Sequence, residues 1–242
     1  NSAGRVSAVA LAAMLIFATA PSALALLYGD CVQSEITAPG EVDTYTFYGE
    51  SWEVVSVRMS DDDAYGAVYP RIRVYDPDDI LIASNSAGNG GFSANINALS
   101  LSTAGTYRIL ADDRDGTGVG SYGLHLQCVS TPGQAVVLSY GDCDQSSIDT
   151  LACRATYAFT GSAGDVVSIR MSDANAYGDV YPLIRLHGPD GVLVASDSAG
   201  HGQYSALIGA ATLPATGTYT ILAGDDDGNG TGSYGLHLQC VS

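Results

Sequence analysis

The sequence predicts an all-β chain of two tandem, jelly-roll-like β-sandwich domains, preceded by an apolar N-terminal segment. Three observations carry this prediction: apolar residues alternate with polar ones, turn residues separate the short apolar runs, and one long segment occurs twice. The expected division is an apolar leader or assembly segment at 1–25, a first sandwich at 26–130 and a second at 131–242.

The alternation is clearest in residues 53–60 of the first copy. Val55, Val57 and Met59 fall on one face of an extended chain, whereas Arg58 falls on the other. Such a pattern is typical of a strand with one buried face. Further strands are expected at 43–49, 70–76, 79–84, 92–99, 105–112 and 123–128.

Turn residues divide these strands. DPDD at 76–79 and GPDG at 188–191 combine Pro, Asp and Gly in the way that tight turns require. Seven or eight short strands per copy, with no helical periodicity between them, predict a sandwich of two sheets.

The internal repeat has an offset of 112 residues, since Tyr28 corresponds to Tyr140. YGDC at 28–31 returns at 140–143, RMSD at 58–61 returns at 170–173, and GSYGLHLQCVS closes both copies. A repeat of this length indicates a duplicated whole domain, not a solenoid of small units.

The charge balance restricts the function. The chain has 26 acidic and nine basic residues and a formal net charge of −17, so it repels phosphate backbones and is not expected to bind nucleic acid. It carries no nucleophile-elbow, zinc-protease or phosphate-loop motif. We therefore expect a protein that is not an enzyme.

The cysteines repeat with the domains. Cys31 and Cys128 are as far apart as Cys143 and Cys240, which predicts the disulfides Cys31–Cys128 and Cys143–Cys240. Each would join the first and last strands of one domain and indicates a secreted, oxidising location. Cys153 is left over, and two interpretations remain open: a buried free thiol, or an intermolecular or reshuffled bridge.

Two acidic loops are the candidate metal site, with calcium as the candidate cofactor. Calcium prefers several carboxylate and carbonyl oxygens on a flexible loop, and glycines at 116 and 228 permit such a loop. The alternative is a pair of solvated hairpin tips, where Asp and Gly suit the turn. The candidate ligands are Asp112, Asp113, Asp115, Asp225, Asp226 and Asp227.

Two tyrosine loops are the candidate ligand-binding residues. AYGAVYP holds Tyr65 and Tyr69, and AYGDVYP holds Tyr177 and Tyr181. These rings could stack on a sugar or a protein partner, or they could cover the end of the core.

The succession DTYTFYG, VVSVRMS, STAGTYRILADD and GSYGLHLQ, with its second copy, resembles the bacterial pre-peptidase C-terminal domain. The resemblance implies secreted β-sandwich modules, often attached to proteases, whose relatives in collagenases bind matrix and calcium. No catalytic domain accompanies the two copies in this sequence.

The N-terminal segment is apolar over residues 6–20, with Arg5 before it and a small-residue cleavage signature ending at Ala25 after it. One interpretation is a secretory signal peptide, because the run is short for a transmembrane anchor. The other is a retained assembly strand that adds to another copy of the chain, head to tail. Its contact residues would be Val9, Leu11, Ala13, Leu15 and Phe17.

Comparison of the two copies also places residues 23–27 in the first strand of the first domain, because the AVVL run before the second copy occupies the same position. Two functions follow as hypotheses. The first is an extracellular structural protein, the subunit of a surface filament or pilus-like fibre joined through the apolar segment. The alternative is a secreted glycan- or matrix-binding module, dependent on calcium.

Overall fold

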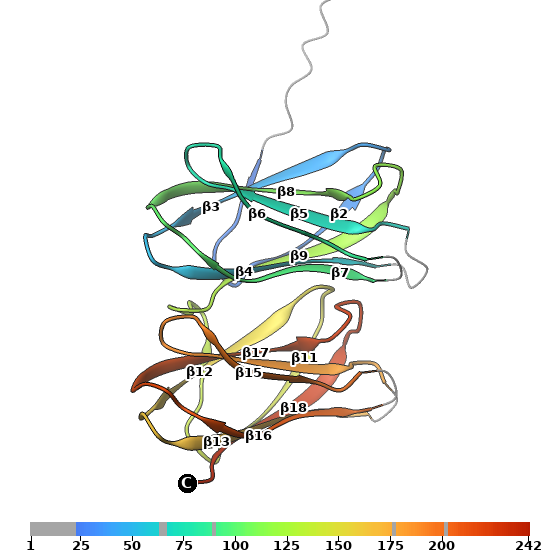
Figure 1. Cartoon of the computed structure of the whole chain (residues 1–242). Coiled ribbons are helices and arrows are strands. Elements are labelled where there is room, and N and C mark those ends of the chain that lie inside the picture. The colour runs from blue at the N-terminus through green and yellow to red at the C-terminus, as the bar shows by residue number, and fades with distance from the viewer. Residues whose placement is uncertain (1–22, 63–66, 89–90, 176–177, 201–202) are drawn as a thin grey trace, which may run out of the picture.

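The computed structural model describes residues 23–62, 67–88, 91–175, 178–200 and 203–242. Within these ranges the regular structure consists of strands alone, arranged as two sandwiches stacked one upon the other (Figure 1). The predicted all-β, tandem-sandwich fold class is therefore confirmed. Each domain has nine strands, compared with the seven or eight expected, because separate strands form at residues 24–25 and 31–36 of the first domain and at the equivalent residues of the second.

The first domain consists of a five-stranded and a four-stranded sheet, ordered β1-β3-β8-β5-β6 and β2-β9-β4-β7. Its strands are β1 (Leu24–Ala25), β2 (Cys31–Ile36), β3 (Val42–Gly49), β4 (Val54–Asp61), β5 (Pro70–Tyr75), β6 (Leu81–Ser86), β7 (Ser93–Ser100), β8 (Gly105–Asp113) and β9 (Gly120–Cys128).

The second domain repeats this topology as β10-β12-β17-β14-β15 and β11-β18-β13-β16. Its strands are β10 (Val136–Val137), β11 (Cys143–Ile148), β12 (Arg154–Gly161), β13 (Val166–Asp173), β14 (Pro182–His187), β15 (Leu193–Ser198), β16 (Ser205–Thr212), β17 (Gly217–Asp225) and β18 (Gly232–Cys240).

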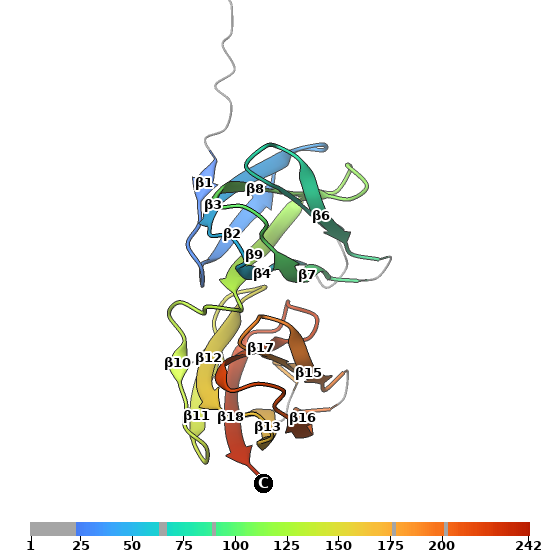
Figure 2. The same cartoon turned by 60° about the vertical axis from the view of Figure 1, so that its left-hand side comes forward.

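The short first strands lie at the edges of the five-stranded sheets. β1 pairs parallel with β3, and β10 pairs parallel with β12 (Figure 2). Leu26 and Leu138, which follow them, are buried in the two cores. The AVVL run at 135–138 between the two domains, the linker run, therefore begins the second domain in the way that residues 23–27 begin the first, as the repeat predicts.

The cores form as the alternation predicts, with one informative exception. Ile72 and Val74 on β5 are buried, while Arg71 and Arg73 between them are partly exposed. β4, by contrast, is buried along its whole length, whereas its counterpart β13 alternates between buried and more exposed residues. A strand that is buried on both faces must have something packed on each of them. The core of domain 1 packs on one face of β4, and domain 2 packs on the other.

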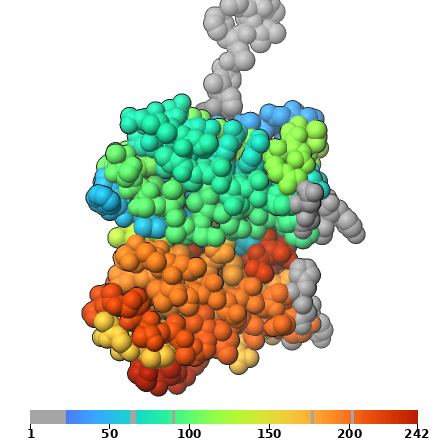
Figure 3. Space-filling view, in the orientation of Figure 1, coloured from blue at the N-terminus to red at the C-terminus, as the bar shows by residue number. Residues whose placement is uncertain are grey.

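The four sheets are accordingly stacked as layers. The outer face of the four-stranded sheet of domain 1 meets the outer face of the five-stranded sheet of domain 2 (Figure 1). The two domains abut over a broad contact in the space-filling view (Figure 3). The outer face of the last sheet, β11-β18-β13-β16, lies at the far end of the stack.

Candidate functional site

The cysteine pairing differs from the prediction. Cys31 is bonded to Cys153, with 5.7 Å between their Cα atoms, and so joins the two domains. Cys128, Cys143 and Cys240 are free. The predicted bridges Cys31–Cys128 and Cys143–Cys240 are therefore wrong, and the leftover Cys153 is one half of the disulfide.

The strand register explains this correction. Cys31 lies directly opposite His125 on β9, so both side chains are on the outer face of the sheet. Cys128 is three residues further along β9 and therefore points to the other face, into the core, where it is fully buried. Two cysteines on opposite faces of one sheet cannot be bridged. Cys143 lies opposite His237, so the same argument separates it from Cys240.

Arg58 is the central side chain of the interface between the domains. It lies in the middle of β4, is fully buried, and points across to the second domain. Its Nη1 donates to the carbonyl oxygen of Asp225, and its Nη2 to that of Asp226, each at 2.5 Å. A buried guanidinium thus binds two backbone carbonyls at the end of β17, which fixes the distance between the two sandwiches.

Polar contacts and a small apolar cluster surround Arg58. Gln127 Nε2 donates to Thr156 Oγ1 at 2.7 Å, and Arg154 Nη2 donates to Asn95 Oδ1 at 2.6 Å. The interface also contains a separate buried cluster of Val54, Val129 and Leu222. Such a mixture of buried polar pairs and apolar contact is typical of a fixed interface, and the disulfide adds a covalent link.

Burial dominates the electrostatics of this interface. It lowers the pKa of Arg58 to about 10, although Asp225 and Asp226 oppose the shift. Burial, together with the nearby cations Arg154 and Arg58, lowers the pKa of His125 to about 3. His125 is therefore neutral at physiological pH and serves as a packed side chain, not as a proton-transfer group.

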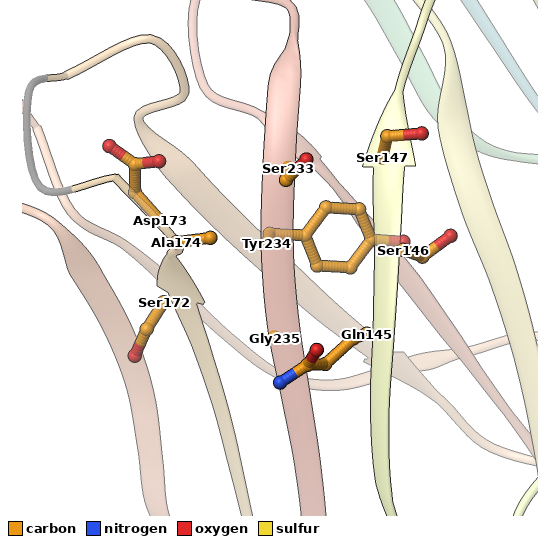
Figure 4. Close-up of a pocket in the computed structure, with 9 residues that line it drawn as sticks. All are labelled: Gln145, Ser146, Ser147, Ser172, Asp173, Ala174, Ser233, Tyr234 and Gly235. Atoms are coloured by element: carbon orange, nitrogen blue, oxygen red, sulfur yellow. The ribbon is translucent and has the colours of Figure 1, made fainter.

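A hollow of about 580 Å³ lies on the outer face of the last sheet, around Gly235 on β18. Figure 4 shows that it is flanked by side chains from β11 and β13, among them Gln145 and Ser172. In domain 1 the corresponding position, Gly123, is covered: a Cβ there would be 2.4 Å from the carbonyl oxygen of Leu151. Gln33 Nε2 also donates to that carbonyl, at 3.2 Å. In domain 1 the site thus receives the loop that carries Cys153.

The candidate calcium ligands of the first loop are engaged in the fold. Asp112 forms ion pairs with Arg71 (2.7 Å) and Arg73 (2.6 Å). Asp113 accepts hydrogen bonds from the backbone N–H groups of Tyr69, Thr117 and Gly118. Burial alone would raise the pKa of Asp113, but these amide hydrogen bonds outweigh it and lower that pKa. Asp115 pairs with Arg114.

The second loop has a similar arrangement. Asp225 accepts hydrogen bonds from the amides of Tyr181, Gly228 and Gly230, and Asp226 and Asp227 follow it. In the described ranges, no group of three or more His, Cys, Asp or Glu side chains is placed to hold one ion. Calcium binding stays a prediction from the sequence.

Some of the remaining predicted residues lie within the described ranges and others lie outside them. Val9, Leu11, Ala13, Leu15 and Phe17, together with Tyr65 and Tyr177, lie outside the described residues. Tyr69 stacks under the guanidinium of Arg114, with Arg114 Cζ 4.8 Å from the ring centre. Tyr181 lies just before β14, and its amide binds Asp225.

Sequence reasoning missed Arg58 and Arg154 as interface residues. One signal was present: each is an arginine within an otherwise apolar or small-residue run, and Cys153-Arg154 replaces Glu41-Val42 at the same repeat position. A departure that places both a thiol and a cation at one point of a close repeat indicates a contact within the chain that the second domain makes with this face and the first domain does not.

Comparison with known proteins agrees with the resemblance found in the sequence. The model of the bacterial pre-peptidase C-terminal domain matches residues 153–224, within the second sandwich. The matched family is named for a domain at the C-terminal side of peptidases. The predicted resemblance is thus confirmed for the second copy, and the first copy has the same topology.

Two solved structures illustrate the likeness. The pre-peptidase C-terminal domain of a Bacillus anthracis collagenase is 18% identical, covers 44% of this chain and 95% of its own, and has a TM-score of 0.38. A putative secreted protein from Eubacterium rectale is 12% identical, covers 86% of this chain and 74% of its own, and has a TM-score of 0.28. Scores this low support no argument about function.

No curated protein matches the chain. Within the described ranges, none of the secondary structure is a helix that could cross a membrane.

Proposed function

We propose that this chain is a non-catalytic, extracellular structural protein, a subunit of a surface filament or pilus-like fibre. The observation that carries the proposal is the interface between its domains. Two sandwiches that could have been joined by a linker alone are held in one stacked block by buried Arg58 and the Cys31–Cys153 disulfide. A block of this kind keeps a fixed length and direction, which a fibre subunit requires.

Two features support an extracellular location. A disulfide between domains persists in an oxidising compartment. The strongly acidic charge keeps a secreted protein soluble at high concentration and disfavours contact with nucleic acid.

The apolar segment at residues 6–20 is the proposed joining element. Electron microscopy of the full chain tests this. We expect filaments from the unmodified protein and dispersed particles from Leu11→Asp/Leu15→Asp, because two charges prevent burial of the segment in a neighbouring copy. Ser2→Asp adds charge outside the run and should leave filaments intact. Dispersed particles from the unmodified protein at every concentration would contradict the proposal.

Glycan or matrix binding, with calcium as cofactor, is the second proposal from the sequence. No contact among the described residues favours it over the structural role. A glycan array probed with and without a chelator tests it directly, and chelator-sensitive binding would make it the leading function.

A further inference from the structure

The outer face of the sheet β11-β18-β13-β16 in domain 2 reproduces the face of domain 1 that is already in use. In domain 1 this face receives domain 2 through Arg58, Gln127, Gln33 and Cys31. Eight central positions are identical in the two domains: Cys31/Cys143, Gln33/Gln145, Ser56/Ser168, Arg58/Arg170, Ser60/Ser172, Gly123/Gly235, His125/His237 and Gln127/Gln239.

In domain 2, no described part of the chain covers these residues in the way that the second domain covers those of domain 1. Arg170 and Gln239 are exposed, whereas Arg58 and Gln127 are buried. Above Gly235 lies the open hollow of Figure 4, at the position where the carbonyl oxygen of Leu151 lies over Gly123. Domain 2 thus presents the central receiving residues on a face that the described part of its own chain leaves exposed.

We infer that this surface binds the first domain of a second copy of this chain, which presents the outer face of its sheet β1-β3-β8-β5-β6. The inference rests on the proposed filament function and names the surfaces that would build it. The first reason is that the receiving residues mostly bind backbone atoms. Arg58 and Gln33 bind the carbonyls of Asp225, Asp226 and Leu151, and a carbonyl is present whatever the side chain.

The incoming loop of domain 1 has the required backbone shape. Gly40 corresponds to Ala152, and both have left-handed backbones, with φ of 78° and 64°. Thr44 corresponds to Thr156, so the acceptor for the glutamine on the receiving face is retained. Residues 38–41 of one copy can therefore enter the hollow at Gly235 of another copy, in the same way that residues 150–153 cover Gly123 within the chain.

A coupled substitution supports a second copy as the occupant. Within the chain, Arg154 on the incoming face binds Asn95 on the receiving face. In the proposed contact both members are replaced at once, by Val42 on the incoming face and Leu207 on the receiving face. A partly buried polar pair is thus exchanged for an apolar pair, which leaves no polar group without its partner. It also gives a role to Leu207, which is 50% exposed.

The apolar cluster of the interface is retained as well. Val54 and Val129 of the receiving face correspond to Val166 and Val241, and Leu222 of the incoming face corresponds to Leu110. Val241 is exposed and Val166 and Leu110 are partly exposed. The proposed contact would bury all three.

Several residues of the incoming face differ from their counterparts in domain 2, among them Arg71 for the buried Leu183 and Arg108 for the buried Thr220. Two further departures shape the contact. Glu41 stands where Cys153 stands, so the contact between copies is non-covalent and Cys143 keeps its thiol. Gly191 packs so closely on Val54 that a Cβ added to this glycine would lie 2.5 Å from the Val54 Cβ. Asp79 occupies the equivalent position in domain 1, so the turn that carries Asp79 must lie further from its neighbour than the Gly191 turn does in the internal interface. Because two different surfaces meet, the contact is head to tail, and a contact that repeats the stacking of the two domains within the chain extends the stack as an open array.

Filling the hollow is the first test. Gly235→Leu adds a side chain where the nearest neighbouring atom is 3.9 Å from the Cβ position, so the fold should tolerate it. We expect sedimentation of the full chain to show self-association weakened about tenfold or more, with an unchanged melting temperature. Gly133→Leu, which adds the same side chain in open space, should associate like the unmodified protein. Unaltered association of Gly235→Leu would overturn the inference.

Cross-linking is the second test. Glu41→Cys recreates across copies the pair that Cys31 and Cys153 form within one. In a buffer with oxidised glutathione as the oxidant, we expect a ladder of reducible multimers that forms about tenfold or more faster than with Ser51→Cys, because docking concentrates the thiols. Adding Cys143→Ser to the Glu41→Cys variant should abolish the ladder, because it removes the thiol with which the new cysteine pairs. Equal rates for Glu41→Cys and Ser51→Cys would count against the docking surface.

The two proposals fail separately. Filaments that survive Gly235→Leu but are dispersed by Leu11→Asp/Leu15→Asp would retain the filament function and remove this surface from it. The reverse result would retain the surface and remove the N-terminal segment from assembly.

Discussion

Arg58 and Arg170 form a matched pair for testing the interface between the domains, because they occupy the same position in the two copies. Arg58 is fully buried and donates to two carbonyls of the other domain, whereas Arg170 is exposed and donates to Ser205 Oγ of its own domain at 3.5 Å. Arg58→Ala leaves one buried and one partly buried carbonyl acceptor without their donor, at about 1–3 kcal/mol each. Removal of a desolvated cation offsets part of that loss, so we expect a net destabilisation of about 3 kcal/mol.

Urea denaturation followed by circular dichroism measures this difference. At a slope of about 3 kcal/mol per molar urea, the Arg58→Ala midpoint should fall by about 1 M. Arg170→Ala should change the free energy of unfolding by no more than about 0.5 kcal/mol, as is usual for exposed residues. The measurement should be made under conditions where the protein is monomeric, so that contacts between copies do not contribute. Equal effects of the two substitutions would refute the reasoning.

Three further predictions concern the same block. Cys153→Ser removes the disulfide between residues 122 positions apart, so it should lower the free energy of unfolding by up to about 5 kcal/mol in the chain-entropy estimate. Cys143→Ser removes a free thiol and should leave that free energy unchanged, and calorimetry measures both. The pKa of His125 falls from its usual 6.5 to about 3 on folding, so the unfolded chain takes up the proton first. The stability from this histidine is complete above pH 6.5 and is lost as the pH falls toward 3, by about 2 kcal/mol at pH 5; His125→Gln should flatten that part of the stability–pH curve. Asp225→Ala removes the acceptor of three backbone amides and should cost about 2–3 kcal/mol with or without calcium; a protein that is destabilised only when calcium is present would instead support the metal site.

Much of the fold could be predicted from the sequence because strand alternation and turn chemistry are local properties. The inward positions Val55, Val57 and Met59 are fully buried, as the alternation requires. The short edge strand β1 was predictable only by comparison with the linker run, since two residues carry no periodicity of their own.

The interface could not be predicted, because alternation assigns the residues opposite the core to solvent. Arg58, His125 and Gln127 look like outward polar residues in the sequence, and they do point outward, but a second domain lies there. The disulfide prediction failed for a related reason. Equal cysteine spacing indicated equal roles, while the register places Cys31 and Cys128 on opposite faces of one sheet.

The disulfide map of the protein tests the central claim most directly, because one covalent bond reports which faces are in contact. Digestion without reduction, followed by mass spectrometry, should find a peptide pair joined through Cys31 and Cys153, with Cys128, Cys143 and Cys240 as free thiols. Peptides joined as Cys31–Cys128 and Cys143–Cys240 would contradict the stacked arrangement, and with it the docking surface inferred on the second domain.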